Sequence, residues 1–112
     1  MTVSANIKPP NTTAIRKQLR SSIELALGRD LDSAFLYGSR ARGDAGPDSD
    51  WDVLVMLHDN ADWLKARAKM RRLIGKIAED TNERVSILPL RWTDANEHAG
   101  LLANVAREGR PL

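Results

Sequence analysis

Residues 34–57 of this chain read AFLYGSRARGDAGPDSDWDVLVML. In this stretch two short apolar runs flank a polar segment rich in glycine, arginine and aspartate. Residues 34–37 are apolar and aromatic, which favours a buried strand. Residues 38–49 contain three glycines and a proline, so we expect a loop. Residues 51–57 predict a second strand that is apolar on both faces except at its beginning, which is typical of a central strand.

Two aspartates, Asp50 and Asp52, stand at the beginning of the second strand with one residue between them. Side chains alternate across a strand, so both carboxylates project from the same face. Carboxylates this close repel each other unless a cation lies between them. Mg²⁺ is the natural cation, because it prefers oxygen ligands and is usually held by one or two carboxylates together with substrate phosphates. Two ions are an option, since two-metal sites promote phosphoryl transfer.

The loop after the first strand has the residues of an anion-binding site. Gly38 lets a phosphate approach the backbone, and amides directly after a strand can form an anion-binding nest. Ser39 adds a hydroxyl donor. Arg40 and Arg42 carry planar, permanently charged groups that suit phosphate oxygens. We therefore predict that these four residues bind a nucleotide beside the metal ligands Asp50 and Asp52, which we also predict to be catalytic.

The rest of the chain predicts helices around these strands. Residues 12–27 and a segment from Asp59 or Asn60 to about Asp80 have helical apolar periodicity. Gly75 lies in the middle of the second helix at a cost of about 1 kcal/mol relative to Ala, so we expect close packing there. Residues 85–90 predict a third strand, with Pro89 at an edge or near its end. A last helix begins at Thr93. The predicted fold class is α/β (α+β), with a small mixed sheet of about three strands.

The whole chain has 112 residues, a net charge of +2 and no cysteine. This length predicts one domain, which we place at residues 12–112 after an N-terminal arm at residues 1–11. The small net charge gives no argument for nucleic acid or membrane binding. We find no apolar core of signal-peptide length and no run of about 18 apolar residues, so we expect a cytoplasmic protein.

Together, Gly38-Ser39, ten intervening residues and Asp50-Trp51-Asp52 resemble the signature of the DNA polymerase β-like nucleotidyltransferase superfamily. The wider segment is similar to its minimal members, the MNT proteins, and so is the ending at residues 101–112. The resemblance implies transfer of a nucleotide to an acceptor hydroxyl with release of pyrophosphate. For antitoxins of the MNT type it implies a Mg²⁺-dependent transfer of AMP from ATP to a tyrosine of a HEPN-type toxin.

One departure from the superfamily concerns the third strand, which usually supplies a third carboxylate. Here Ser86 stands in that region, and the nearby Glu83 need not point toward the aspartates. An alternative function is therefore a catalytically weakened module that binds and masks a toxin. A weaker alternative is transfer to a small molecule, whose known enzymes carry an additional acceptor domain. The basic run in the second helix indicates a solvated face, with an RNA or acidic-partner surface as its alternative.

Overall fold

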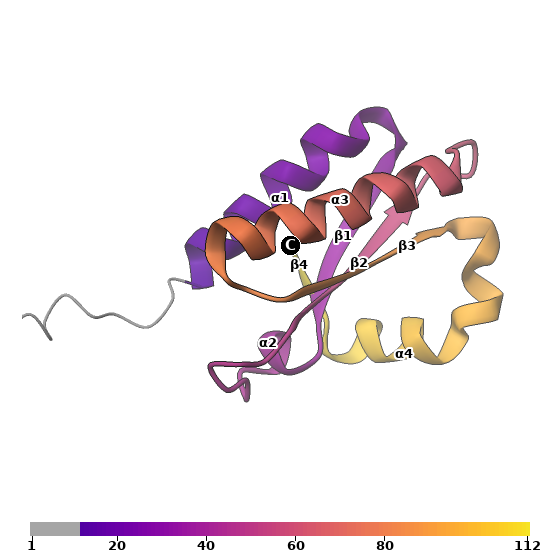
Figure 1. Cartoon of the computed structure of the whole chain (residues 1–112). Helices are drawn as coiled ribbons and strands as arrows, with labels where there is room; N and C mark the ends of the chain where they lie inside the picture. Colours follow the sequence, from indigo (N-terminus) through magenta and orange to yellow (C-terminus); the bar gives the residue numbers. More distant parts are fainter. Residues whose placement is uncertain (1–11) are drawn as a thin grey trace, which may run out of the picture.

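The computed structural model describes residues 12–112 (Figure 1). The elements follow in the order α1 (Thr12–Leu27), the 3₁₀ turn η2 (Gly28–Asp30), β1 (Leu31–Tyr37), α2 (Ser39–Arg42), β2 (Trp51–Leu57), α3 (Trp63–Thr81), β3 (Val85–Arg91), the 3₁₀ segment η3 (Trp92–His98), α4 (Ala99–Glu108) and β4 (Arg110–Pro111). The predicted N-terminal arm, residues 1–11, lies outside the described residues. Among the described helices, none is long and apolar enough to cross a bilayer.

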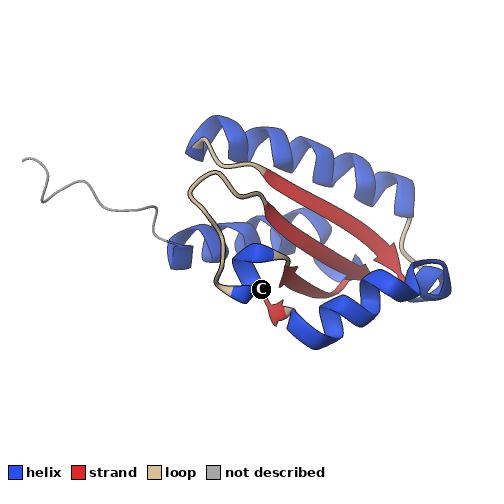
Figure 2. Ribbon diagram, turned by 90° about the horizontal axis from the view of Figure 1, so that it is seen from below, coloured by secondary structure: helices blue, strands red, loops and turns tan. Residues whose placement is uncertain are grey.

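The strands form one mixed sheet in the order β3-β2-β1-β4 (Figure 2). β1 is antiparallel to both β2 and β4, whereas β2 and β3 are parallel. The predicted fold class is confirmed, with a fourth strand added to the three expected. Pro89 lies in β3, an edge strand, as its missing amide hydrogen requires.

Helices cover both faces of the sheet. α1 and α3 lie on one face and α4 lies on the other (Figure 1). The larger core joins α1 and α3 to the β2 side chains Trp51, Val53, Val55 and Leu57. The smaller core joins Leu54 and Met56 of β2 to Val105 of α4. The two-faced β2 predicted from the sequence is therefore confirmed.

The two long helices bury one stripe each. In α1 the stripe is Ile15, Leu19, Ile23 and Leu27, and in α3 it is Ala66, Met70, Leu73 and Ile77. α3 begins later than expected, because the Asp62 carboxylate accepts the Lys65 amide at 3.1 Å. Asp59 instead accepts the amide of Thr93 at 2.9 Å. The close packing expected at Gly75 is wrong, since this glycine is exposed and a Cβ there would meet nothing within 4 Å.

Other elements differ from the expected ones for two reasons. Some are set by contacts between segments that are distant in the sequence, and others are too short to be predicted. β1 begins at Leu31, three residues earlier than predicted, because it pairs with β2 up to Leu57. The expected loop contains the single turn α2, which is too short for periodicity to indicate. The expected helix from Thr93 is a 3₁₀ segment followed by α4. β4 forms because Arg110 and Pro111 pair with β1.

Candidate functional site: a glycine-serine turn beside two aspartates

The predicted site lies where β1 ends and β2 begins. These strands are antiparallel neighbours, and Tyr37 is the register partner of Asp52. Gly38 follows directly, with φ +73° and ψ −158°, a backbone conformation that is essentially restricted to glycine. A Cβ on Gly38 would collide with Oδ2 of Asp52. The structure therefore brings together Gly38 and Asp52, which lie 14 positions apart in the sequence.

The turn after Gly38 is held by its own backbone. The Gly38 carbonyl accepts the amides of Ala41 and Arg42, each at 3.1 Å, and the Ala41 side chain is buried in the larger core. The first amides of a helix have no acceptor within that helix. The amides of Ser39 and Arg40 occupy these positions in α2, and Ser39 is half-buried. Backbone amides in such a turn are a suitable cradle for an anion.

The surroundings of Asp52 shift the pKa of its carboxyl group. Partial burial raises the pKa of Asp52, the negative charge of Asp50 raises it further, and the positive charge of Arg42 opposes both effects. Burial and the charge of Asp52 likewise raise the pKa of the Tyr37 hydroxyl. Tyr37 therefore belongs to the immediate surroundings of Asp52, and it is protonated near neutral pH.

Asp50 is more exposed and forms an ion pair. Its Oδ1 lies 3.1 Å from Nε of Arg84, with 51% of the Asp50 side chain and 72% of the Arg84 side chain exposed. Arg84 also donates from Nη2 to the carbonyl of Asp48 at 2.8 Å. We had not predicted a role for Arg84 from the sequence. No local pattern marks it, because Arg84 precedes β3 and meets Asp50 only through the pairing of β3 with β2.

The two predicted arginines have different surroundings. Arg42 is exposed and bonds Asp44 and Glu108, each at 3.2 Å, and its positive charge acts on Asp52. Arg40 instead stacks 4.5 Å above the ring of Trp51 and donates from Nη2 to the carbonyl of Ser49 at 2.9 Å. These contacts hold the loop in place. A nucleotide contact by either arginine stays a prediction, and the surroundings favour Arg42.

Glu83 belongs with Arg40 and Trp51. Its carboxylate accepts from Nε1 of Trp51 at 3.1 Å and lies 3.7 Å from Nη2 of Arg40. Trp51 is buried in the larger core, on the opposite face of β2 from Asp52. Glu83 is therefore engaged in holding the loop against β3.

The third-carboxylate position is occupied by a serine. β2 and β3 are paired so that Asp52 lies beside Ser86, whose side chain is exposed. Within residues 12–112, no group of three or more Asp, Glu, His or Cys side chains is arranged to hold a metal. The protein contributes two carboxylates at this point, which fits Mg²⁺, because this ion usually keeps several waters and shares its ligands with substrate phosphates.

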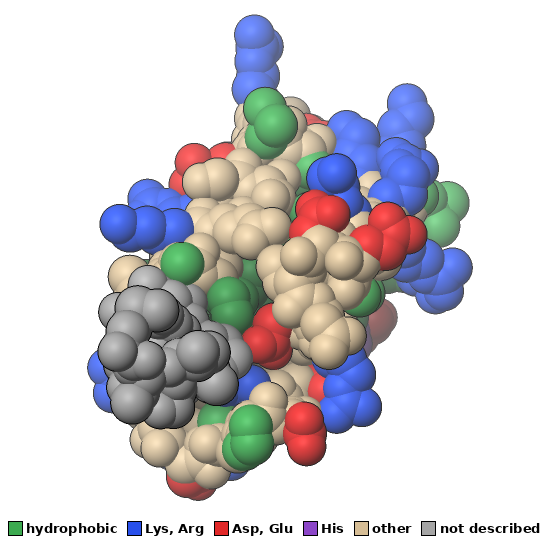
Figure 3. All heavy atoms as spheres, turned by 60° about the vertical axis from the view of Figure 1, so that its left-hand side comes forward, with side chains coloured by type: hydrophobic (Ala, Val, Ile, Leu, Met, Phe, Trp, Pro, Cys, Tyr) green, Lys and Arg blue, Asp and Glu red, His purple; other side chains and the backbone are tan. Residues whose placement is uncertain are grey.

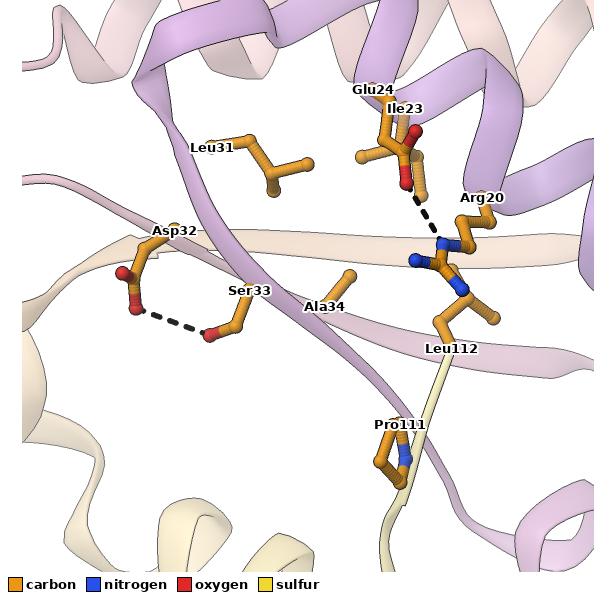
Figure 4. Close-up of a pocket in the computed structure, with 9 residues that line it drawn as sticks. All are labelled: Arg20, Ile23, Glu24, Leu31, Asp32, Ser33, Ala34, Pro111 and Leu112. Atoms are coloured by element: carbon orange, nitrogen blue, oxygen red, sulfur yellow. Dashed lines mark hydrogen bonds and ion pairs between the residues drawn. The ribbon is translucent and has the colours of Figure 1, made fainter.

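Other surface features lie away from the aspartates. A hollow of about 210 Å³ is formed where α1, the beginning of β1 and the end of the chain meet (Figure 4). Its polar side chains bond each other, Arg20 to Glu24 at 2.8 Å and Ser33 to Asp32 at 3.3 Å. None of the predicted site residues lines it.

The basic run of α3 is largely at the surface. Lys65, Arg67, Arg71 and Arg72 are exposed, and Lys69 is half-buried. Lysine and arginine side chains gather at the upper right of the face in Figure 3. Their exposure agrees with a solvated face, and an RNA or acidic-partner surface stays the alternative.

Comparison with known proteins places this geometry in a family. The family model described as "Polymerase beta, Nucleotidyltransferase" matches residues 21–112. The chain belongs to this nucleotidyltransferase family. The match includes the glycine-serine turn, both aspartates and all four strands. A search of the curated proteins finds no match.

Solved structures share the fold at low sequence identity. A toxin-antitoxin with AMP-PNP is 22% identical, with a TM-score of 0.58 over 90% of this chain and 71% of that one. A mutant of the toxin-antitoxin MntA-HpeT is also 22% identical, with a TM-score of 0.61 and the same coverage. A protein from Shewanella oneidensis is 22% identical, with a TM-score of 0.57 over 91% of this chain and 71% of that one. At this identity the likeness shows the shared fold of the nucleotidyltransferase family.

Proposed function

We propose that this nucleotidyltransferase-family protein transfers AMP from ATP to a protein hydroxyl in a Mg²⁺-dependent reaction. The observation that carries the proposal is the contact between Gly38 and Asp52, which sets an anion-binding turn directly against a carboxylate pair. The acceptor we propose is a hydroxyl of a partner protein. A HEPN-type toxin is the partner we propose, supported by the likeness to the toxin-antitoxin structures.

In this reaction the acceptor oxygen forms a bond to the α-phosphorus of ATP as the bond to the leaving pyrophosphate oxygen breaks, and the proton of the acceptor hydroxyl is released to water. The amides at Ser39 and Arg40, with the Ser39 hydroxyl, bind phosphate oxygens. Asp50 and Asp52 would hold Mg²⁺, which supplies positive charge against the phosphate oxygens when bound. Arg42 lies at the edge of the site, where its charge also favours the triphosphate.

The transfer is tested by incubating the protein with ATP labelled at the α-phosphate, Mg²⁺ and a candidate partner protein of the HEPN type. We expect label on the partner from the wild type and almost none from Asp52→Asn, which keeps the shape of the side chain without its charge. Asp80→Asn, a change in an exposed residue of α3, is the matched control and should label like the wild type. Equal labelling by all three proteins would refute catalysis at this site.

A second function is favoured by Ser86 beside Asp52. A site without a third carboxylate still binds nucleotide but activates an acceptor hydroxyl poorly, and the protein would then neutralise its toxin by covering it. The Asp50→Asn/Asp52→Asn double variant separates the two functions in cells that express the toxin. Loss of protection by a folded variant supports transfer, whereas full protection supports masking.

A further inference from the structure

The charge of the candidate site differs on its two sides. On the β1 side, Asp52 contacts the turn at Gly38. On the β3 side, the residues that face Asp52 and Asp50 are the neutral Ser86 and the cationic Arg84. A site built to clamp two divalent ions, which stand about 3.5–4 Å apart, needs additional anionic oxygens on this side to offset their mutual repulsion.

Within residues 12–112, no third Asp, Glu, His or Cys side chain is arranged with Asp50 and Asp52 to hold a metal. Glu83 is bonded to Trp51 and lies against Arg40. Asp44 and Glu108 are both paired with Arg42. The ligands that these described residues offer to a metal are therefore the carboxylates of Asp50 and Asp52.

Arg84 already brings a positive charge to Asp50. Its Nε lies 3.1 Å from Asp50 Oδ1, and its Nη2 is fixed at 2.8 Å from the carbonyl of Asp48. The guanidinium is thus held by two contacts. An arginine guanidinium is a planar cation that suits carboxylate oxygens.

We infer that this site takes one divalent cation with its nucleotide, and that the Arg84 guanidinium provides the second positive charge, at Asp50. The inference rests on the proposed function and concerns the number of metal ions that the same site binds. Asp52, beside the anion-binding turn, is then the main protein ligand of the single ion. Arg84 lowers the attraction of Asp50 for a second ion, and Ser86 supplies no carboxylate to hold one.

Equilibrium dialysis with Mn²⁺, in place of Mg²⁺, and a non-hydrolysable ATP analogue counts the ions directly. We expect one Mn²⁺ per bound analogue in the wild type. Ser86→Asp places a carboxylate beside Asp52 and should raise the ratio to two. Ser21→Asp, at an exposed position of α1, is the matched control and should keep the ratio at one.

Arg84→Gln provides an independent readout if Ser86→Asp does not fold. Removing the competing charge should lower the dissociation constant of Mn²⁺ severalfold without adding a second ion. Arg71→Gln removes an exposed arginine of α3 and should leave that constant unchanged. Two ions per analogue in the wild type, or equal constants for Arg84→Gln and Arg71→Gln, would overturn the inference while leaving the proposed function intact. A wild type that binds neither Mn²⁺ nor the analogue would overturn both.

Discussion

Replacing Gly38 by alanine tests the geometry of the site through protein stability. Gly38 has φ +73° and ψ −158°, and a non-glycine residue in this region costs about 1–3 kcal/mol. The new Cβ would also collide with Asp52 Oδ2. Turning the Asp52 side chain away from its preferred rotamer adds about 0.5–1.5 kcal/mol. Together these costs predict a loss of about 1.5–4.5 kcal/mol in the free energy of unfolding.

Two other glycines separate the components of this cost. Gly43 also has a positive φ, +86°, but a Cβ there would meet nothing within 4 Å. Gly43→Ala should therefore lose about 1–2 kcal/mol through backbone strain alone. Gly75 has neither constraint and lies within α3, so Gly75→Ala should gain up to about 1 kcal/mol.

Urea unfolding followed by tryptophan fluorescence measures all three variants, since Trp51 is buried in the core. Thermal unfolding gives a second measure, with a decrease of several degrees expected for each kcal/mol lost in a domain of this size. The part of the stability cost that the collision causes should disappear when Gly38→Ala is made in a protein that also carries Asp52→Ala. The reasoning fails if Gly38→Ala costs no more than Gly43→Ala, or if its cost is the same with and without Asp52.

Three further predictions concern other features of the structure. Asp52 has a raised pKa in the folded protein, mainly through burial. The folded state therefore binds the Asp52 proton more tightly than the unfolded state does. Stability consequently falls as the pH rises from below the unfolded-state pKa through the folded-state pKa. Asp52→Asn should be more stable than the wild type at neutral pH, and the difference in the free energy of unfolding should shrink in acid. An equal difference at all pH values, measured by urea titration, would contradict this prediction. Asp62→Ala removes the cap of α3 and should lower the free energy of unfolding in urea by about 1 kcal/mol. Asn60→Ala, at a position that the sequence predicts as a cap, should change it by less than about 0.5 kcal/mol. Equal effects of the two variants would contradict the observed start of the helix. Glu83→Ala leaves the Trp51 N–H and the Arg40 guanidinium without their carboxylate. This change should cost about 1–3 kcal/mol of stability, measured by thermal unfolding. Glu79→Ala, at an exposed position of α3, is the control, and similar unfolding midpoints for the two variants would refute the structural role of Glu83.

Much of the site could be predicted from the sequence because its determinants are local. The alternation of β2 places its apolar side chains in two separate cores, as the sequence indicated. The glycine-serine pair and the two aspartates could be placed at strand ends because the apolar runs that mark the strands are local, whereas strand pairing brings the two groups together. The buried stripe of α1 follows from side chains repeated at helical spacing. These features depend on residues within a few positions of each other.

The division of roles among the charged residues could not be predicted in this way. Arg40 and Arg42 are two positions apart, yet one stacks on Trp51 and the other pairs with Asp44 and Glu108. Arg84 meets Asp50 across the sheet, and Ser86 is placed beside Asp52 by the register of β2 and β3. Each of these relations joins segments that the chain keeps far apart.

By itself, the sequence determined the turn, the carboxylate pair and the strands that carry them, because backbone periodicity and glycine conformations are local properties. Only the tertiary structure decided the fourth strand, the ion pair of Asp50 with Arg84, and the serine that stands beside Asp52. Strand pairing and charge contacts depend on which distant segments meet, and no local pattern encodes that choice.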